Sequence, residues 1–204
     1  GWYNNNRGGV LEAISDRELI IRLCQGSLDA LGLLYDRYQR MVYRTALAIT
    51  GDPDAAADLL QDVFLRLYRF APRIDVERPL EPWLYRMTAN LAYTWVKRHK
   101  GWSKSLEDIA EWLLGGRKNP PLQQVESDDT WAQVQQAVLK LPLPQRLVVV
   151  LYYVNDLSLQ EIADILAIPV GTVKSRLHYG REALKEHLGL LSEGGKSEMQ
   201  YEFT

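Results

Sequence analysis

Cysteine is almost absent from this chain of 204 residues, whose only thiol is Cys24. A single cysteine excludes a disulfide within the chain and a cysteine-rich zinc site. The three histidines, at positions 99, 178 and 187, have no metal-ligand spacing either. The sequence therefore predicts no metal and no cofactor, and this cysteine usage fits a reducing, cytoplasmic compartment.

Long apolar runs are also missing. No stretch approaches the roughly 20 residues needed to cross a bilayer, and the start has no secretory signal pattern. The chain has no glycine-rich phosphate loop, no nucleophile elbow and no HExxH pattern. The sequence thus predicts no membrane insertion and no enzymatic activity, and binding remains as the mode of action.

Helical periodicity is what the sequence does contain, in a chain with 47% hydrophobic and 25% charged residues. Apolar residues recur at three- and four-residue steps, and strand-type alternation is missing from the first half. Breaks occur at Gly26-Ser27 and at Gly51-Asp52-Pro53. Ser15 or Asp16 is expected to cap the first helix, and Asp52 or Asp54 the helix after the second break. We predict helices over residues 15–50 (interrupted once), 55–69, 83–100 and 130–141.

Residues 157–188 have the pattern of a helix-turn-helix. Ser158 and Glu161 form a capping box, so a helix should begin at Leu159 and end before Pro169. In the second helix Val173, Leu177, Gly180 and Leu184 share one face, which leaves on the other faces Thr172, Lys174, Ser175, Arg176, His178, Tyr179 and Arg181. Such side chains suit base edges and phosphates in a DNA groove. A helical hairpin with a solvated face explains the same pattern.

The helix predicted over 55–69 has two unlike faces. Its buried stripe is expected to consist of Leu60, Val63, Phe64 and Leu67, and its outward side chains include Asp58, Gln61, Asp62 and Leu65. Four aspartates and no base lie between Asp52 and Asp62. Favourable carboxylates near a helix N-terminus explain this composition without any partner.

The next helix is basic and aromatic. From Trp83 to Lys104 there are five Lys or Arg residues and no acid, and aromatic residues alternate with them. This combination suits single-stranded nucleic acid, because rings stack on bases and cations follow phosphates. Burial in the core explains the tryptophans equally well. Residues 105–129 then carry six acids against two bases, which predicts a linker containing one short helix over 105–114.

In this order, the motifs resemble bacterial extracytoplasmic-function (group 4) sigma factors of the sigma-70 family. The run from LSLQEIA to GTVKSRL resembles promoter-reading region 4, AAADLLQDVFLRLYR resembles region 2.2, and helix 83–100 resembles regions 2.3 and 2.4. RLVVVLYYV is rich in valine and tyrosine, but its place in the family pattern predicts a helix. Ala89 and Thr94 depart from the arginine and aspartate common in the family, so −10 sequence preference does not transfer.

The resemblance implies an all-α fold with region 2 over 10–100, a linker over 101–127, region 4 over 128–192 and a tail over 193–204. It implies an alternative sigma factor that binds core RNA polymerase and promoter DNA, and that is held inactive by an anti-sigma factor. The implied −35 contacts are Thr172, Lys174, Ser175, Arg176, His178 and Arg181. The implied −10 contacts are Arg86, Asn90, Tyr93, Lys97 and Arg98, next to a base-pocket loop over 73–82. The implied core polymerase contacts are Asp58, Gln61, Asp62 and Leu65.

Two other classes of protein compete with this interpretation. A helix-turn-helix regulator that does not join the polymerase would lack both the basic aromatic helix and the acidic helix face. A helical adaptor that acts only through protein contacts would give Lys174, Arg176 and Arg181 no role on DNA.

Overall fold

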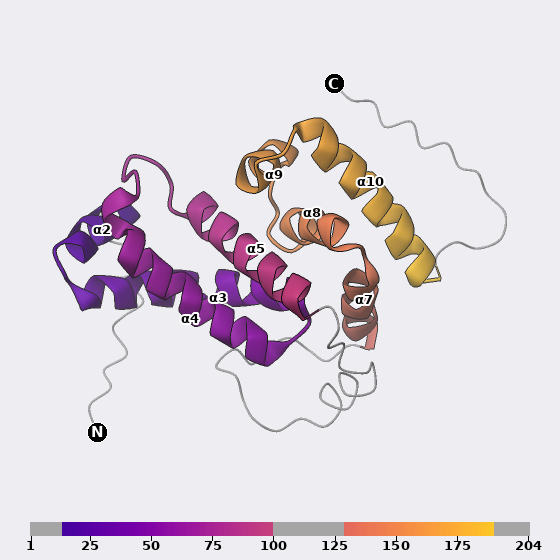
Figure 1. Ribbon diagram of the computed structural model, residues 1–204, viewed down its shortest axis with the longest axis horizontal. Coiled ribbons are helices and arrows are strands. Elements are labelled where there is room, and N and C mark those ends of the chain that lie inside the picture. Colours follow the sequence, from indigo (N-terminus) through magenta and orange to yellow (C-terminus); the bar gives the residue numbers. More distant parts are fainter. Residues whose placement is uncertain (1–13, 100–128, 190–204) are drawn as a thin grey trace.

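The computed structural model describes residues 14–99 and 129–189, with side chains from residue 133 onward in the second stretch (Figure 1). Within these two stretches the regular elements are α-helices and one 3-10 turn, without any strand. The predicted all-α fold is confirmed. The predicted linker over 101–127, its short helix and the tail over 193–204 lie outside the described residues.

The N-terminal unit is a bundle built around α3. Its elements are α2 (Asp16–Cys24), α3 (Leu28–Thr50), α4 (Pro53–Phe70), the 3-10 turn η1 (Ala71–Arg73) and α5 (Glu81–Arg98). Helices α2, α4 and α5 all contact α3, which is the longest of these helices. Leu34, Val42, Ala46 and Ile49 of α3 are fully buried, so this helix forms the centre of the core.

Side-chain caps set the starts of these helices. The Ser15 hydroxyl accepts a hydrogen bond from the Glu18 N–H, and the Asp52 carboxylate accepts from the N–H groups of Asp54 and Ala55. These bonds satisfy backbone donors that a helix start leaves without partners. Of the alternatives left open by the sequence, Ser15 and Asp52 are therefore the caps. Gly51 ends α3 with a left-handed φ of 71°, which glycine adopts without steric cost.

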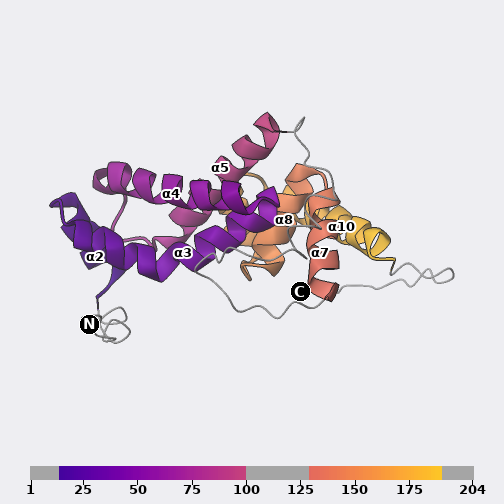
Figure 2. The same ribbon diagram turned by 90° about the horizontal axis from the view of Figure 1, so that it is seen from below.

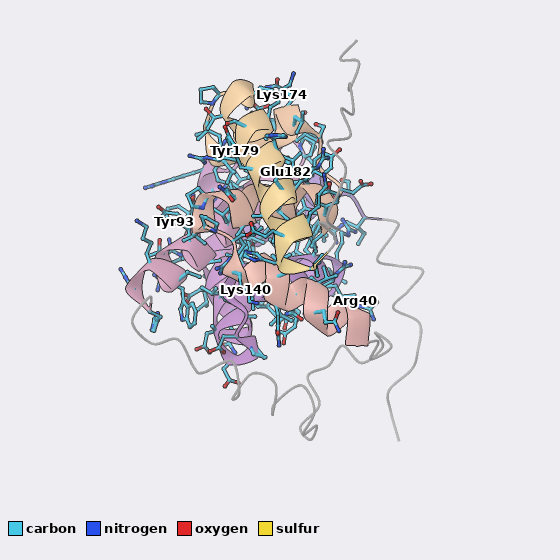
Figure 3. The ribbon with its side chains drawn as sticks, turned by 90° about the vertical axis from the view of Figure 1, so that its right-hand side faces the viewer. Arg40, Tyr93, Lys140, Lys174, Tyr179 and Glu182 are labelled. Atoms are coloured by element: carbon cyan, nitrogen blue, oxygen red, sulfur yellow. The ribbon has the colours of Figure 1, made fainter. Side chains whose placement is uncertain are left out.

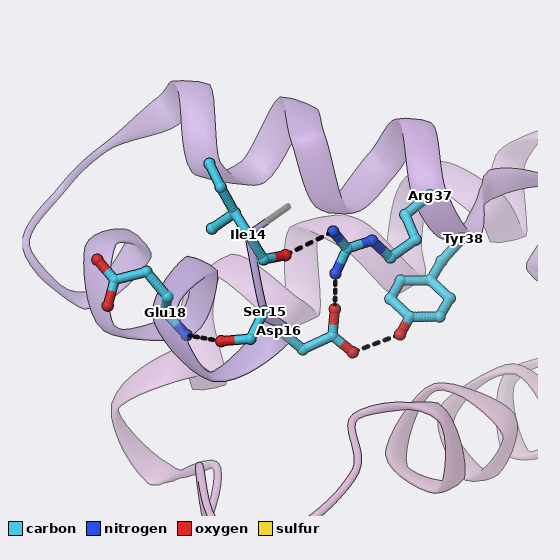
Figure 4. Close-up of polar contacts among 6 residues, drawn as sticks. All are labelled: Ile14, Ser15, Asp16, Glu18, Arg37 and Tyr38. Atoms are coloured by element: carbon cyan, nitrogen blue, oxygen red, sulfur yellow. Dashed lines mark hydrogen bonds and ion pairs between the residues drawn. The ribbon is translucent and has the colours of Figure 1, made fainter. Parts of the chain in front are cut away.

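Asp16 links α2 to α3 instead of capping its helix. Its carboxylate accepts hydrogen bonds from the Arg37 guanidinium and from the Tyr38 hydroxyl (Figure 4). Arg37 also donates to the Ile14 carbonyl at 2.7 Å. Burial, followed by the hydrogen bond to Asp16, raises the pKa of Tyr38, so its hydroxyl stays a donor even in alkaline solution.

The C-terminal unit contains the predicted helix-turn-helix. Its helices are α7 (Asp129–Lys140), α8 (Leu143–Tyr153), α9 (Leu159–Leu166) and α10 (Val170–His187). The valine-rich run is α8, so its prediction as a helix is confirmed, and it supplies buried residues that include Val148, Val149 and Leu151. These side chains pack against Ile162 of α9 and Val173 of α10. Helix α8 thus supports both helices of the motif.

The two units share an interface. Arg146 of α8 donates to the Ile49 carbonyl of α3 at 2.7 Å, and the Asn155 amide donates to the Thr45 hydroxyl at 2.8 Å. The core of the N-terminal unit continues into three side chains of α8, which are Leu143, Leu147 and Val150. Figures 1 and 2 show α2 and α4 toward one end of the molecule and α10 toward the other.

Candidate promoter and polymerase interfaces

Helix α5 presents a stripe formed by four of the residues predicted to contact the −10 element. Arg86, Asn90, Tyr93 and Lys97 follow at steps of four, three and four residues, which places them along one side of the helix. The opposite side is buried through Leu84, Thr88, Ala89 and Ala92. The Lys97 ammonium lies 5.5 Å from the centre of the Tyr93 ring. The predicted contact Arg98 is exposed at the end of the helix and lies off this stripe.

Arg86 is held by the C-terminal unit. Its Nε donates to the Ile165 carbonyl at 3.2 Å, and its Nη2 donates to the Asp164 carbonyl. Both carbonyls belong to the last turn of α9, where a helix carries partial negative charge. One of the predicted −10 residues therefore caps a helix of the helix-turn-helix. Sequence spacing gives no sign of this contact, because the partners are 78 and 79 residues apart.

A cavity of about 180 Å³ lies between the end of α4 and the start of α5. It is lined by Phe70, Arg73, Ile74, Trp83 and Met87. The Arg73 guanidinium lies 5.8 Å from the centre of the Phe70 ring, so a cation borders an otherwise aromatic and aliphatic wall. A flat aromatic ring such as a base can stack on such a wall while the cation faces a phosphate.

Helix α4 exposes a face that is both acidic and apolar. Asp58, Gln61, Asp62 and Leu65 are all exposed and share one side of the helix, as the sequence predicted. Leu65 is 56% exposed, and beside it Tyr68 is 44% exposed. Tyr68 was missed by the sequence reasoning, although it follows Leu65 by three residues. Large apolar side chains grouped on a charged surface are typical of a protein-binding site.

The turn of the helix-turn-helix has the predicted capping box. The Glu161 N–H donates to the Ser158 hydroxyl at 3.3 Å, and the Ser158 N–H donates to the Glu161 carboxylate at 2.8 Å. These hydrogen bonds to Ser158 lower the pKa of Glu161. Helix α9 ends at Ala167, which adopts a left-handed φ of 53°, and Pro169 precedes α10. This geometry fixes where α10 begins.

The predicted −35 residues spread around the exposed part of α10. Val173, Leu177 and Gly180 are buried against the unit, which places Ser175 and His178 on the outermost side of the helix. The flanks carry the other predicted contacts, with Thr172 and Arg176 on one side and Lys174 and Arg181 on the other. The helix therefore presents Ser175 and His178 near the centre of its exposed surface and cations along both edges.

Two further side chains share the outermost side of α10. Tyr179 is 62% exposed and contacts the His178 ring edge-to-face, and Glu182 follows one turn later. Figure 3 shows Lys174, Tyr179 and Glu182 along this helix. The helical repeat places Tyr179 off the buried stripe, so the sequence carries a signal for this residue, which is not among the predicted −35 contacts.

Gly180 allows α10 to approach α8 closely. A Cβ atom at this position would lie 2.7 Å from Cγ2 of Val149, whose side chain is only 2% exposed. We expect Gly180→Ala to lower the free energy of unfolding by about 1–3 kcal/mol through overpacking, reduced by roughly 1 kcal/mol of gained helix propensity. Thermal denaturation measures this change, and Gly171→Ala is the control because a Cβ there meets nothing within 4 Å. Equal stability of Gly180→Ala and Gly171→Ala would contradict the close approach, because only the first alanine meets Val149.

Across residues 14–99 and 129–189, no cluster of His, Cys, Asp and Glu could hold a metal ion. In the same residues, no helix combines the length and the apolar character that a membrane span requires.

Comparison with known proteins identifies both units. The model of Sigma-70 region 2 matches residues 34–101, and the model of Sigma-70, region 4 matches residues 131–184. The ECF RNA polymerase sigma factor SigW of Bacillus subtilis is 34% identical over 185 residues, which cover 84% of this chain and 96% of SigW. SigM of Mycobacterium tuberculosis is 30% identical over 181 residues, which cover 88% of each chain.

Solved structures share the fold. CnrH, in complex with the cytosolic domain of CnrY, aligns with a TM-score of 0.62 at 22% identity over 87% of this chain and 99% of CnrH. The sigma factor RpoE of Bartonella quintana, in complex with the anti-sigma factor NepR, aligns with a TM-score of 0.60 at 20% identity over 78% of this chain and 96% of RpoE. Because SigW is 34% identical over nearly its whole length, the chain belongs to the extracytoplasmic-function (ECF) RNA polymerase sigma factors of the sigma-70 family.

Proposed function

We propose that this protein is a group 4 sigma factor that binds core RNA polymerase and directs initiation at promoters by recognising their −35 and −10 elements. The observation that carries the proposal is that the two units expose chemically different surfaces, each of which suits a different form of DNA. Helix α5 combines cations with an aromatic ring, and α10 is the second helix of a helix-turn-helix. The first suits an unpaired strand and the second suits intact duplex.

The −35 element is read by α10 in the major groove. The first turns of a recognition helix contact base edges, so Ser175 and His178 are placed for the bases. Lys174 and Arg176 lie on opposite flanks of α10. In the groove, each flank faces base edges or the sugar-phosphate backbone of one of the two DNA strands.

The −10 element is held by the N-terminal unit as a melted strand. Asn90, Tyr93 and Lys97 continue the stripe beyond Arg86 and contact the strand, and an unstacked base enters the cavity beside Trp83. Arg86 joins them only after it leaves the carbonyls of α9, so the two units separate when the strand is bound.

Core polymerase binds the acidic and apolar face of α4. Asp58 and Asp62 supply charge, while Leu65 and Tyr68 supply apolar area that is exposed in the isolated chain. We further propose that an anti-sigma factor regulates the protein in the cytoplasm. Support comes from CnrH and RpoE, which share the fold and were solved in complexes with CnrY and the anti-sigma factor NepR.

Reconstitution with core polymerase and a promoter library tests the function. Sequenced transcripts should reveal start sites that depend on this chain, whereas a regulator that does not join the polymerase would create none. Start sites no more selective than those of core polymerase alone would refute the proposal.

Two sets of variants separate the two surfaces. Asp62→Arg should abolish or strongly weaken association with core polymerase, because it reverses the charge of the α4 face. Lys174→Ala and Arg176→Ala should retain core binding and weaken binding to the −35 element, by ~1–3 kcal/mol for a bidentate base contact. Lys140→Ala, an exposed lysine at the end of α7, is the matched control for the DNA-facing variants. Equal loss of core binding and DNA binding in both sets would contradict these assignments.

A further inference from the structure

Arg181 is fixed in place by two tyrosines at the end of α8. Its Nε donates to the Tyr153 hydroxyl at 2.6 Å. Its guanidinium carbon lies 5.4 Å from the centre of the Tyr152 ring and 5.5 Å from that of the Tyr153 ring. The two rings meet edge-to-face at 4.9 Å. The tyrosines therefore form an aromatic corner against which a side chain of α10 is held.

This arrangement leaves several hydrogen-bond donors unused at the surface. Tyr153 accepts from Arg181, so its own O–H remains available to a further acceptor. Within the described part of the chain, no hydrogen-bond partner is found for the two terminal nitrogens of Arg181. Tyr153 is 55% exposed, so a ligand from solvent can reach the pair. A guanidinium fork beside a phenol O–H is a donor set that matches phosphate oxygens.

The position of Arg181 on α10 indicates that the bound phosphate belongs to the DNA backbone. Arg181 lies six residues beyond Ser175, about 9 Å along the helix axis, and on the same flank as Lys174. Base edges are read from the first turns of a recognition helix, so a cation this far along the flank faces the wall of the groove, where the sugar-phosphate backbone runs.

We infer that Tyr153 and Arg181 form a clamp for one backbone phosphate beside the −35 element, with Tyr152 as a positioning residue beneath the guanidinium. This inference rests on the proposed function, and it extends the DNA-binding surface from α10 to the end of α8. Holding the arginine before DNA arrives reduces the side-chain entropy that binding would otherwise cost. Glu182, the nearest acid along α10, is paired with Lys185 at 2.8 Å and so repels the phosphate less.

The inference is tested with holoenzyme made from full-length chain and core polymerase, on a duplex carrying a −35 element found in the promoter library. Arg181→Ala should weaken binding roughly tenfold or more, and to a similar extent for different −35 sequences, because a phosphate contact carries no sequence information. It should also reduce the slope of the logarithm of the binding constant against the logarithm of the salt concentration by about 1, as expected for the loss of one phosphate contact. Tyr153→Phe should weaken binding less, because it removes one hydroxyl and keeps the ring beside the guanidinium, whereas the control Lys140→Ala should bind like wild type.

Neutral methylphosphonate linkages, introduced one at a time, locate the phosphate. One linkage should weaken binding of wild-type holoenzyme but have no further effect on Arg181→Ala. The clamp is refuted if Arg181→Ala keeps the wild-type salt slope and linkage profile, or if it changes the preference among −35 sequences. Thermal denaturation of each variant and of wild type shows whether a loss of binding comes from unfolding. Failure of wild-type holoenzyme to select any promoter refutes the proposed function itself, which is a different result.

Discussion

Gly51→Cys combined with Leu139→Cys, in a chain where Cys24 is replaced by serine, is expected to abolish promoter opening when oxidised and to restore it when reduced. Gly51 ends α3 in the N-terminal unit, and Leu139 belongs to α7 in the C-terminal unit. A Cβ atom at position 51 would lie 3.2 Å from Cγ of Leu139, close to the distance of about 3 Å between a Cβ and the partner sulfur in a disulfide. The bond would hold the two units together.

Loss of opening follows from the contacts at the interface. Arg86 cannot donate to the carbonyls of Asp164 and Ile165 and bind a melted strand at the same time. The contacts between Asn155 and Thr45 keep the same surfaces close. Because the α4 face lies outside this interface, the oxidised chain should still associate with core polymerase through that face. Abortive transcription measures opening, and co-purification measures association.

Each single cysteine variant, treated with the same oxidant, is the control for oxidation as such. Cysteine at position 51 is strained by the left-handed φ of 71°, at a cost of roughly 1–2 kcal/mol, so the reduced double variant must first be shown to be active. If the fully cross-linked chain opened promoters as well as its reduced form does, promoter opening would not require the two units to separate.

The sequence predicted the local structure of this protein well. The capping box of Ser158 and Glu161 is confirmed, because each partner lies within one helical turn of the other. The exposed face of α4 was also found in advance, since a 3.6-residue repeat decides which side chains share a face, and the residues of the stripe from Arg86 to Lys97 were named from the family resemblance. Their roles on DNA and polymerase remain predictions.

Contacts between distant segments could not be predicted in the same way. Arg146 reaches Ile49 across 97 residues, and Asn155 reaches Thr45 across 110 residues. No repeat relates such positions, and the packing of two finished units decides whether they meet. Arg181 illustrates the same limit, because its charge indicated DNA binding while its partner Tyr153, on another helix, carried no signal in the sequence.

Arg146→Ala is expected to be strongly destabilising, with a loss of about 3–5 kcal/mol in the free energy of unfolding. The guanidinium donates to the carbonyls of Ile49, Leu139 and Leu141, which lie at the ends of α3 and α7. Carbonyls at a helix end have no partner within the helix, and each buried one left without a donor costs roughly 1–3 kcal/mol. For a chain of this size, the midpoint of thermal unfolding should fall by roughly 6–20 °C.

Arg146→Lys separates the hydrogen bonds from the charge. A lysine ammonium supplies a positive charge but could not match the planar fork that reaches three carbonyls at the ends of α3 and α7. We therefore expect Arg146→Lys to be intermediate between wild type and Arg146→Ala. If the lysine variant were as stable as wild type, a single donor nitrogen would suffice in place of the guanidinium fork. If the alanine variant were as stable, the ends of α3 and α7 would find other donors, and Arg146 would not hold the two units together.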